Sequence, residues 1–283
     1  MNHNSPLSNV DALNFAVVRL QPYRGELRLG SATGFFYTGK VGGDDALWLV
    51  TNWHVLSGRS ACPPNQPLHE GHALPDRIVF RLIRNQRSSE GTSDVSIQDL
   101  SASLFDDQGS AKWYQHKTGP AVDVGVLRLD LNREDYYIRG INEIASQNDM
   151  AISVGSQVFV LGYPLGFTHF VETPIWKSGA IASEPHLETE RTQRRVLIDA
   201  TTRQGMSGAP VIIRERTHYL SEAGIVVEHP NATRFIGVYA SRPDIPGANE
   251  LPEADRRAEV GFFYKSGCVE ETIAQGNPGP SSD

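Results

Sequence analysis

The sequence predicts an all-β protein. Short runs of β-branched and aromatic residues recur along the chain, and in several of them apolar and polar residues alternate with the period of a strand. Turns rich in Gly, Asp, Asn and Pro separate these runs, and no internal repeat or low-complexity array is visible. Many short strands joined by such turns are typical of β-barrels and β-sandwiches.

Six strands are predicted in the first half of the chain. Two of them flank the turn GKVGGDD, which favours a hairpin, and the segments IVFRLI and VDVGVLRL alternate clearly. The segment 87–118 is polar and is predicted to be a long loop, part of which packs against the body through Trp113 and Tyr114. The predicted strands are 15–20, 26–29, 34–37, 47–50, 77–83 and 122–129.

The second half is predicted to contain seven short strands. Turn-like stretches at 184–195 and 242–255 separate some of them and are expected to be solvated loops. The predicted strands are 157–161, 175–181, 196–200, 211–213, 225–228, 235–240 and 260–264. Regular alternation fades between the two halves, and the expected layout is a flexible start at 1–14, a first lobe at 15–131, a linker at 132–153, a second lobe at 154–270 and a flexible end at 271–283.

Composition narrows the class of function. The formal net charge is −7 and the Lys and Arg residues are scattered, which argues against a nucleic-acid-binding protein because phosphate binding needs a basic face. Cys62 and Cys268 lie too far apart for a zinc cluster, and we interpret them as ordinary thiols. Neither a signal peptide nor an apolar stretch of membrane-spanning length is visible, so a cytoplasmic protein without membrane contact is expected.

The segment TTRQGMSGAPV has the features of a nucleophile turn. Acyl transfer needs an activated hydroxyl and donors that stabilise the oxyanion. Ser207 lies between Gly205 and Gly208, and glycines allow the positive φ that directs backbone N–H groups inward. We predict Ser207 as the nucleophile and the amides of Gly205 and Ser207 as the oxyanion hole. Taken alone, the motif also fits a plain glycine-rich turn.

His54 is the candidate base. It follows the apolar run LWLV and the residues Thr-Asn-Trp, so that a strand end would hold it rigidly. A lone histidine at a strand end is more often structural than catalytic, but this one is accompanied by a nucleophile motif further along the chain. His169, which follows GYPLGF, is a second candidate for a position near the substrate groove.

Asp123 is the candidate for the carboxylate that orients the histidine. It heads the apolar strand VGVLRL, where a chain can bury one acid, and a buried carboxylate needs a partner. Such a residue fixes the tautomer of the histidine and stabilises the imidazolium. The alternative interpretation is a residue that merely begins a strand. Four other acids lie in the polar segment and are expected to be solvated: Asp94, Asp99, Asp106 and Asp107.

Together, these motifs resemble a known family. TNWHV, VDVGVL and GMSGAPV, in the order His, Asp, Ser, are similar to the signature blocks of chymotrypsin-fold serine peptidases. GSQVFVLGYPLG resembles the start of the second barrel in bacterial HtrA-type proteases, and FIGVYAS with VGFFYKSG resembles the last strands of that family and of the glutamyl endopeptidases. The resemblance spans about residues 15–270. It implies two six-stranded antiparallel β-barrels with the active site in the cleft between them.

The resemblance also implies an activity, a serine endopeptidase that uses no metal or cofactor. Ser207 would attack the peptide carbonyl, His54 would take its proton and pass it to the leaving amine, and Asp123 would steer the imidazole. Two departures from the family are Met206, where relatives often carry Asp or Asn, and Ala209, where a second glycine is common. The PDZ domain that is typical of HtrA proteins is not expected here, because two barrels would occupy these residues.

The substrate pocket implied by the resemblance is neutral. No acid stands at its base, which argues against cleavage after Lys or Arg, and Glu is disfavoured because a tyrosine replaces the histidine of glutamyl endopeptidases, although Arg242 nearby keeps Glu open. We expect a small or medium apolar side chain there, with the substrate pairing as an extra strand along 240–242. The expected lining residues are Thr201, Thr202, Tyr239, Ala240 and Ser241.

Two alternatives to a constitutively active protease stay open. A catalytically silent binding module would keep the fold, and a regulated protease effector would stay latent until a partner protein binds, with the segment 87–118 over the cleft as one means of restraint. An esterase would show G-x-S-x-G in an α/β setting, and a metal enzyme would show paired histidine ligands beside a carboxylate. The sequence has neither pattern, so both classes of enzyme are disfavoured. The expected partners are therefore a protein or peptide substrate and a regulatory protein.

Overall fold

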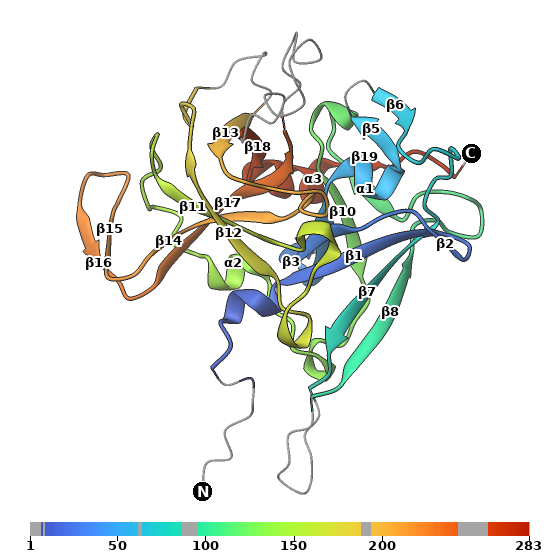
Figure 1. The fold of residues 1–283 in the computed structure, drawn as a ribbon, viewed down its shortest axis with the longest axis horizontal. Helices are drawn as coiled ribbons and strands as arrows, with labels where there is room; N and C mark the ends of the chain where they lie inside the picture. The colour runs from blue at the N-terminus through green and yellow to red at the C-terminus, as the bar shows by residue number, and fades with distance from the viewer. Residues whose placement is uncertain are drawn as a thin grey trace, which may run out of the picture.

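The alternating runs of the sequence pair into two antiparallel sheets that make up the body of the molecule (Figure 1). The computed structural model describes residues 7, 9–61, 64–85, 95–187, 194–242 and 260–282. Each predicted strand overlaps an observed one, and the all-β fold class is confirmed.

The second half of the chain closes into a barrel. Six strands pair in the order β11–β12–β13–β18–β17–β14, and β14 pairs back onto β11. Apolar residues that point inward, such as Val158, Ile198 and Val211, are fully buried. The strands are β11 (Gln157–Gly162), β12 (Ile175–Ile181), β13 (Arg195–Asp199), β14 (Pro210–Glu215), β17 (Ala232–Ser241) and β18 (Val260–Lys265).

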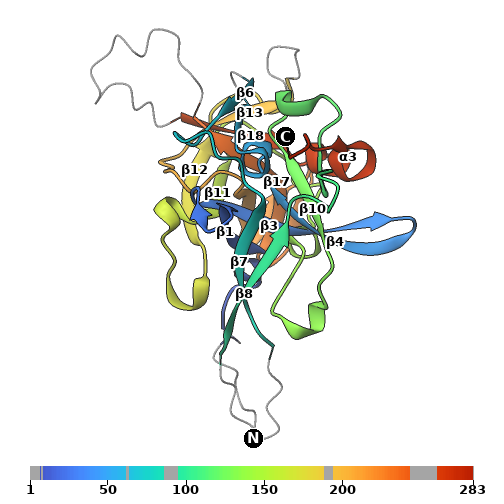
Figure 2. The same ribbon diagram turned by 90° about the vertical axis from the view of Figure 1, so that its right-hand side faces the viewer.

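The first half forms a curled sheet in the order β19–β9–β10–β4–β3–β1–β7–β8, with β2 paired to β1. A hairpin of β3 and β4 projects from it (Figure 2). The strands are β1 (Val17–Arg24), β2 (Leu27–Arg28), β3 (Ala32–Val41), β4 (Asp44–Thr51), β7 (Arg77–Ile83), β8 (Ile97–Ser103), β9 (Trp113–Gln115), β10 (Gly125–Leu129) and β19 (Asn277–Pro278).

This first sheet differs from the closed six-stranded barrel that was expected. Within the described residues, β8 ends the sheet, and the seam between β8 and β9 is bridged where the Lys112 amide donates to the Leu104 carbonyl (2.9 Å). Because β9 has only 3 residues, it cannot pair along the 7 residues of β8. The result is a half-barrel, and the overall arrangement remains that of a chymotrypsin-like double barrel.

One apolar core joins the two sheets. It contains residues from both halves, and the rings of Phe35 on β3 and Phe235 on β17 pack with centroids 5.2 Å apart. Such an aromatic pair contributes about 0.5–1.5 kcal/mol beyond the burial of its surface. The shared core fixes the position of one lobe against the other, and so fixes any site built between them.

Short elements connect the strands. Residues 132–153 run between β10 and β11 and carry η3 (Arg133–Asp135) and α2 (Ile141–Ile144). None of the described helices is long and apolar enough to cross a membrane. The other short elements are η1 (Ala12–Phe15), α1 (Trp53–Ser57), β5 (Arg59–Ala61), β6 (Pro64–Pro67), η2 (Gly119–Ala121), η4 (Pro164–Gly166), η5 (Phe170–Glu172), β15 (His218–Leu220), β16 (Val226–Glu228) and α3 (Gly267–Gln275).

The prediction of a loop over 87–118 is wrong where the structure describes this segment. Residues Ile97–Ser103 form β8, which pairs with β7 along its whole length, and β9 follows. Only Leu100 and Ala102 of β8 pack on the core, between exposed residues, so the strand carries little apolar signal. Trp113 is fully buried, in agreement with the expectation that part of the segment packs down.

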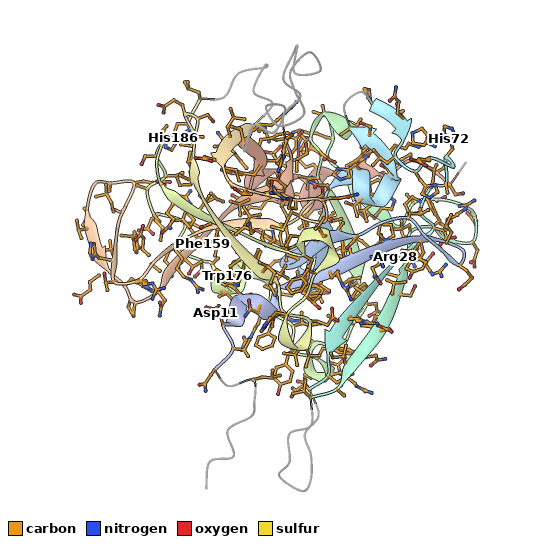
Figure 3. All side chains as sticks on the ribbon, viewed as in Figure 1. Asp11, Arg28, His72, Phe159, Trp176 and His186 are labelled. Carbon is orange, nitrogen blue, oxygen red and sulfur yellow. The ribbon has the colours of Figure 1, made fainter. Side chains whose placement is uncertain are left out.

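Residues 9–14, expected to be flexible, pack on the second barrel instead. Asp11 forms an ion pair with Arg214, whose guanidinium lies 4.9 Å above the ring of Trp176. The indole N–H of Trp176 donates to Asn14 Oδ1 (2.8 Å). Figure 3 shows Asp11 beside Trp176 at this side of the barrel. The charge pair and the cation–π contact hold a segment whose sequence shows no strand or helix pattern.

The C-terminal segment was also expected to be flexible, and it is ordered through residue 282. After β18 the chain forms α3 and then β19, which pairs with β9 at the edge of the first sheet (Figure 1). The Gly279 amide donates to the Trp113 carbonyl (2.9 Å). Backbone pairing on an existing strand edge orders this segment, although it has few apolar residues. Cys268 of α3 is fully buried and forms no disulfide within the described residues, while Cys62 lies outside them.

Candidate active site

The turn that carries Ser207 connects β13 with β14. Gly205 and Gly208 have φ of +94° and +85°, a backbone region that suits glycine. A Cβ on Gly208 would lie 2.2 Å from the Thr33 carbonyl oxygen, so close packing as well as φ requires glycine there. Two glycines at this spacing make a tight turn that exposes the serine between them. Met206, the departure from the family pattern, is fully buried in the core of the second barrel.

His54 and Asp123 are in direct contact. The ring Nδ1 of His54 lies 2.7 Å from Asp123 Oδ2, and the His54 backbone amide donates to Asp123 Oδ1 (2.9 Å). His54 stands in α1, directly after β4, and Asp123 stands just before β10, which pairs with β4. Neighbouring strands of one sheet therefore bring the two residues together.

The electrostatics of the pair favour a protonated imidazole. Burial lowers the pKa of His54, whereas the charge of Asp123 and its hydrogen bond raise it, and the net pKa lies above the ordinary value of 6.5. Burial and the same negative charge raise the pKa of Tyr264 to about 12. The site thus holds a carboxylate, an imidazole that accepts a proton readily, and a neutral phenol.

Ser207 lies beside this pair with its hydroxyl turned to β17. Ser207 and His54 together line a cavity of about 210 Å³ and a second one of about 570 Å³, and Asp123 lines the second. The Ser207 hydroxyl donates to the Ala240 carbonyl (3.1 Å). The structure therefore brings all three predicted residues to one cleft, with a direct hydrogen bond between His54 and Asp123 and none described between His54 and Ser207.

The peptide group between Gln204 and Gly205 is oriented by a neighbouring loop. The Leu165 amide donates to the Gln204 carbonyl (2.6 Å), and in a trans peptide the N–H of the next residue points the opposite way. Among the described residues, neither the Gly205 nor the Ser207 amide donates to a protein acceptor. Two backbone donors on this turn are therefore available to an anion, as an oxyanion hole requires.

Thr33 is a site residue that was not found from the sequence. Its amide donates to the Ser207 carbonyl (2.9 Å), and its hydroxyl donates to the Gly205 carbonyl (2.8 Å) and accepts from the Tyr163 amide (3.1 Å). Thr33 is completely buried and belongs to the first sheet, whereas the turn belongs to the second barrel. The available signal was a polar residue inside the apolar strand ATGFFY, which marks a buried hydroxyl that needs partners.

Thr33→Val is expected to lower the free energy of unfolding by roughly 2–4 kcal/mol, because it leaves the Gly205 carbonyl and the Tyr163 amide buried without partners. Denaturant titration measures this loss. Thr217→Val, at an exposed residue just before β15, is the matched control, with less than about 0.5 kcal/mol expected. Equal losses in the two variants would contradict the role given to Thr33.

The residues expected to line the substrate pocket differ in exposure. Thr202, Tyr239 and Ala240 are buried, Thr201 is half-buried and Ser241 is exposed. The Tyr239 hydroxyl and Thr202 Oγ1 are 2.5 Å apart, and the Tyr239 ring lies against Gly261. The tyrosine thus fills space behind the threonines instead of leaving a deep pocket.

The acids that we set aside as partners of His54 are solvated, as expected, where the structure describes them. Asp99 is exposed and pairs with Arg81, and Asp106 and Asp107 are exposed, while Asp94 lies outside the described residues. His169 lines neither cavity beside Ser207, so it is not part of this cleft. Of the described part of 87–118, only Thr118 lines one of these cavities.

Two β-lobes, with a histidine and an aspartate on the first and a serine turn on the second, define the chymotrypsin-like class of folds. The family model described as "Trypsin-like peptidase domain" matches residues 32–217, more than half of the chain. The chain belongs to the family of trypsin-like peptidase domains. No curated protein sequence matches it significantly.

Solved structures of proteases are similar to the chain at low identity. The inactive form of the Rv3671c protease, from M. tuberculosis H37Rv, is 17% identical over 96% of this chain and 93% of that one, with a TM-score of 0.46. The HtrA-type protease AlgW with a tripeptide is 15% identical over 93% and 62%, with a TM-score of 0.48. The protease Anisep from Arthrobacter nicotinovorans is 12% identical over 92% and 94%, with a TM-score of 0.49.

Proposed function

We propose that the protein is a serine endopeptidase in which Ser207 is the nucleophile, His54 the general base and Asp123 the residue that orients the base. The observation that supports this most is the 2.7 Å contact between His54 Nδ1 and Asp123 Oδ2 on the wall of the cleft that Ser207 also lines. Membership of a peptidase family makes protein or peptide the substrate class.

The reaction follows from the positions of these groups. Nε2 of His54 takes the proton of the Ser207 hydroxyl as Oγ attacks the carbonyl carbon, and the imidazolium gains from the Asp123 charge. The amides of Gly205 and Ser207 donate to the oxyanion. The imidazolium then protonates the leaving amine, and water, deprotonated by His54, releases the acyl group from Ser207.

Labelling by a fluorophosphonate probe tests the nucleophile. The protein is expected to take up one probe per chain, at Ser207, and to hydrolyse peptides from a mixed library. Mass spectrometry of the labelled peptide identifies the residue. Absence of both labelling and hydrolysis in a folded preparation would contradict the proposal and leave the silent binding module as the better explanation.

One observation favours the latent form of the same enzyme. The Ala240 carbonyl, which accepts from the Ser207 hydroxyl, is also the acceptor that a substrate paired along β17 would use. A substrate N–H donating to Ala240 would free the serine hydroxyl to turn to His54. The labelling rate is then expected to rise when a short non-cleavable peptide occupies the cleft; a peptide that only slows labelling would argue for a constitutively aligned site.

For the acyl side of the scissile bond we propose a preference for a neutral, small or medium apolar residue. The hydrogen bond of Tyr239 to Thr202 and the contact of its ring with Gly261 support a shallow pocket.

Tyr239→Leu is expected to shift this preference toward larger apolar residues by about tenfold in the ratio of kcat/KM values. A peptide-library profile measures the ratio, with rates normalised to fluorophosphonate-reactive enzyme. Tyr219→Leu, which alters a buried tyrosine outside the cleft, serves as the control. A strict preference of the wild type for a charged residue would rule out the neutral pocket.

A further inference from the structure

The 210 Å³ cavity beside Ser207 is lined in part by apolar side chains that the proposed chemistry does not use. His54, Gly205 and Ser207 line it, and its other polar side chains are Ser31, His69 and Gln204. None of its described lining residues is Asp, Glu, Lys or Arg. The apolar walls are formed by Pro22, Leu29, Val55, Leu68, Ala73 and Pro75.

Backbone contacts build these walls in advance of any ligand. The Leu68 amide donates to the Gly58 carbonyl (2.9 Å), and the Leu29 amide donates to the Pro22 carbonyl (2.9 Å). Gly58, with φ of +67°, ends α1 and packs so closely that a Cβ there would lie 2.4 Å from Pro75 Cδ. The segment 64–75 is therefore held against α1, and Leu29, directly after β2, lines the same cavity.

The cavity lies on the side of Ser207 away from β17. Ser241 of β17 and Phe262 of β18 line the 570 Å³ cavity, whereas no residue of either strand lines the 210 Å³ cavity. A substrate whose acyl portion pairs along β17 therefore directs its leaving portion toward the 210 Å³ cavity. A cavity of about 150 Å³ holds a molecule the size of benzene, so this one has room for an apolar side chain.

The geometry points to a subsite for the residue that follows the scissile bond, selective for a medium-sized apolar side chain such as leucine. This inference rests on the proposed peptidase function and adds to it that substrate choice is made mainly on the leaving-group side. The shallow pocket at Tyr239 contributes little selectivity on the acyl side, while Leu29 and Ala73, which line only the 210 Å³ cavity of the two, determine what the opposite side accepts.

Acyl transfer to competing amines tests this subsite separately from the acyl side. Wild-type enzyme is mixed with an N-acyl-alanine thiobenzyl ester and equal concentrations of leucinamide and glycinamide. Ser207 forms the acyl-enzyme as the thiolate leaves, and an amine then attacks the ester carbon. The bond from carbon to Ser207 Oγ breaks, the C–N bond forms, and His54 carries the amine proton to Oγ. The ratio of the two peptide products does not depend on how much enzyme is active.

The wild type is expected to favour leucinamide by about tenfold or more. Ala73→Phe, which fills the cavity, and Leu29→Ala, which removes part of its wall, are each expected to reduce the ratio to about threefold or less. Leu220→Ala, on the exposed hairpin of β15, is the matched control and should keep the wild-type ratio.

Two results would overturn the inference while leaving the peptidase function in place: a wild-type ratio near one, or a ratio that Ala73→Phe does not change. A failure to form any acyl-enzyme, seen as no release of benzyl mercaptan from the thioester, would instead overturn the proposed function itself. Lysinamide and glutamic acid α-amide, run in the same competition, are expected to react no better than glycinamide, and a preference for either would also contradict the subsite.

Discussion

Ser207→Ala is expected to lower kcat for peptide cleavage by about a million-fold. The variant keeps the amides of Gly205 and Ala at position 207, so the oxyanion donors survive, but no atom is left to form the acyl-enzyme. In a serine protease that has been dissected in this way, the loss of the nucleophile costs about that factor, and the remaining activity comes from the oxyanion hole and substrate binding. Single-turnover assays on a peptide substrate measure it.

The matched control for this substitution is Ser101→Ala, on the exposed face of β8 and far from the cleft. It should keep full activity and full fluorophosphonate labelling. If Ser207→Ala retained more than a few per cent of the wild-type rate, another residue would have to be the nucleophile, and the assignment of the whole site would fail with it.

Asp123→Asn is expected to lower kcat by about ten-thousand-fold. The carboxylate accepts from both the ring Nδ1–H and the backbone amide of His54. An asparagine has only one accepting oxygen, and its NH₂ group would face one of these two donors or force the ring into the other tautomer. The imidazole would then be unable to take a proton at Nε2.

The same substitution is expected to lower the pKa of His54. In the wild type the charge of Asp123 and its hydrogen bond together outweigh burial and keep this pKa above 6.5. Activity should therefore rise as the pH increases through that raised value and the imidazole loses its proton. With Asn only burial remains, and the midpoint moves downward. NMR titration of the His54 ring follows the shift, and Asp99→Asn, at a solvated acid, should leave it in place. An unchanged midpoint in Asp123→Asn would contradict the assigned pairing.

The three proposed triad residues could be singled out from the sequence because a local pattern marks each of them. LWLV leads into His54, and Asp123 precedes VGVLRL, so the local pattern carries the position of each residue. Pairing of β4 with β10 then brings them together. The glycines around Ser207 were informative because positive φ restricts the residue type, which is a local property of the chain.

Contacts between distant segments could not be predicted in this way. Thr33 looks like an ordinary strand residue until the turn of the second barrel packs on it, and β19 forms by pairing with the edge of β9. The open first sheet depends on the length of β9 relative to β8, and the sequence of each strand says nothing about its neighbour. The depth of the substrate pocket likewise depends on where the ring of Tyr239 packs.

The return of the chain end to the first lobe affects when the site can be assembled. His116, directly after β9, donates from its buried ring to Glu271 of α3, and the edge of β9 is covered by β19. Both partners follow Asp123 in the chain by more than 140 residues. A nascent chain that has already exposed Asp123 therefore still lacks this support, and the proposed site is expected to assemble only after β19 has been synthesised.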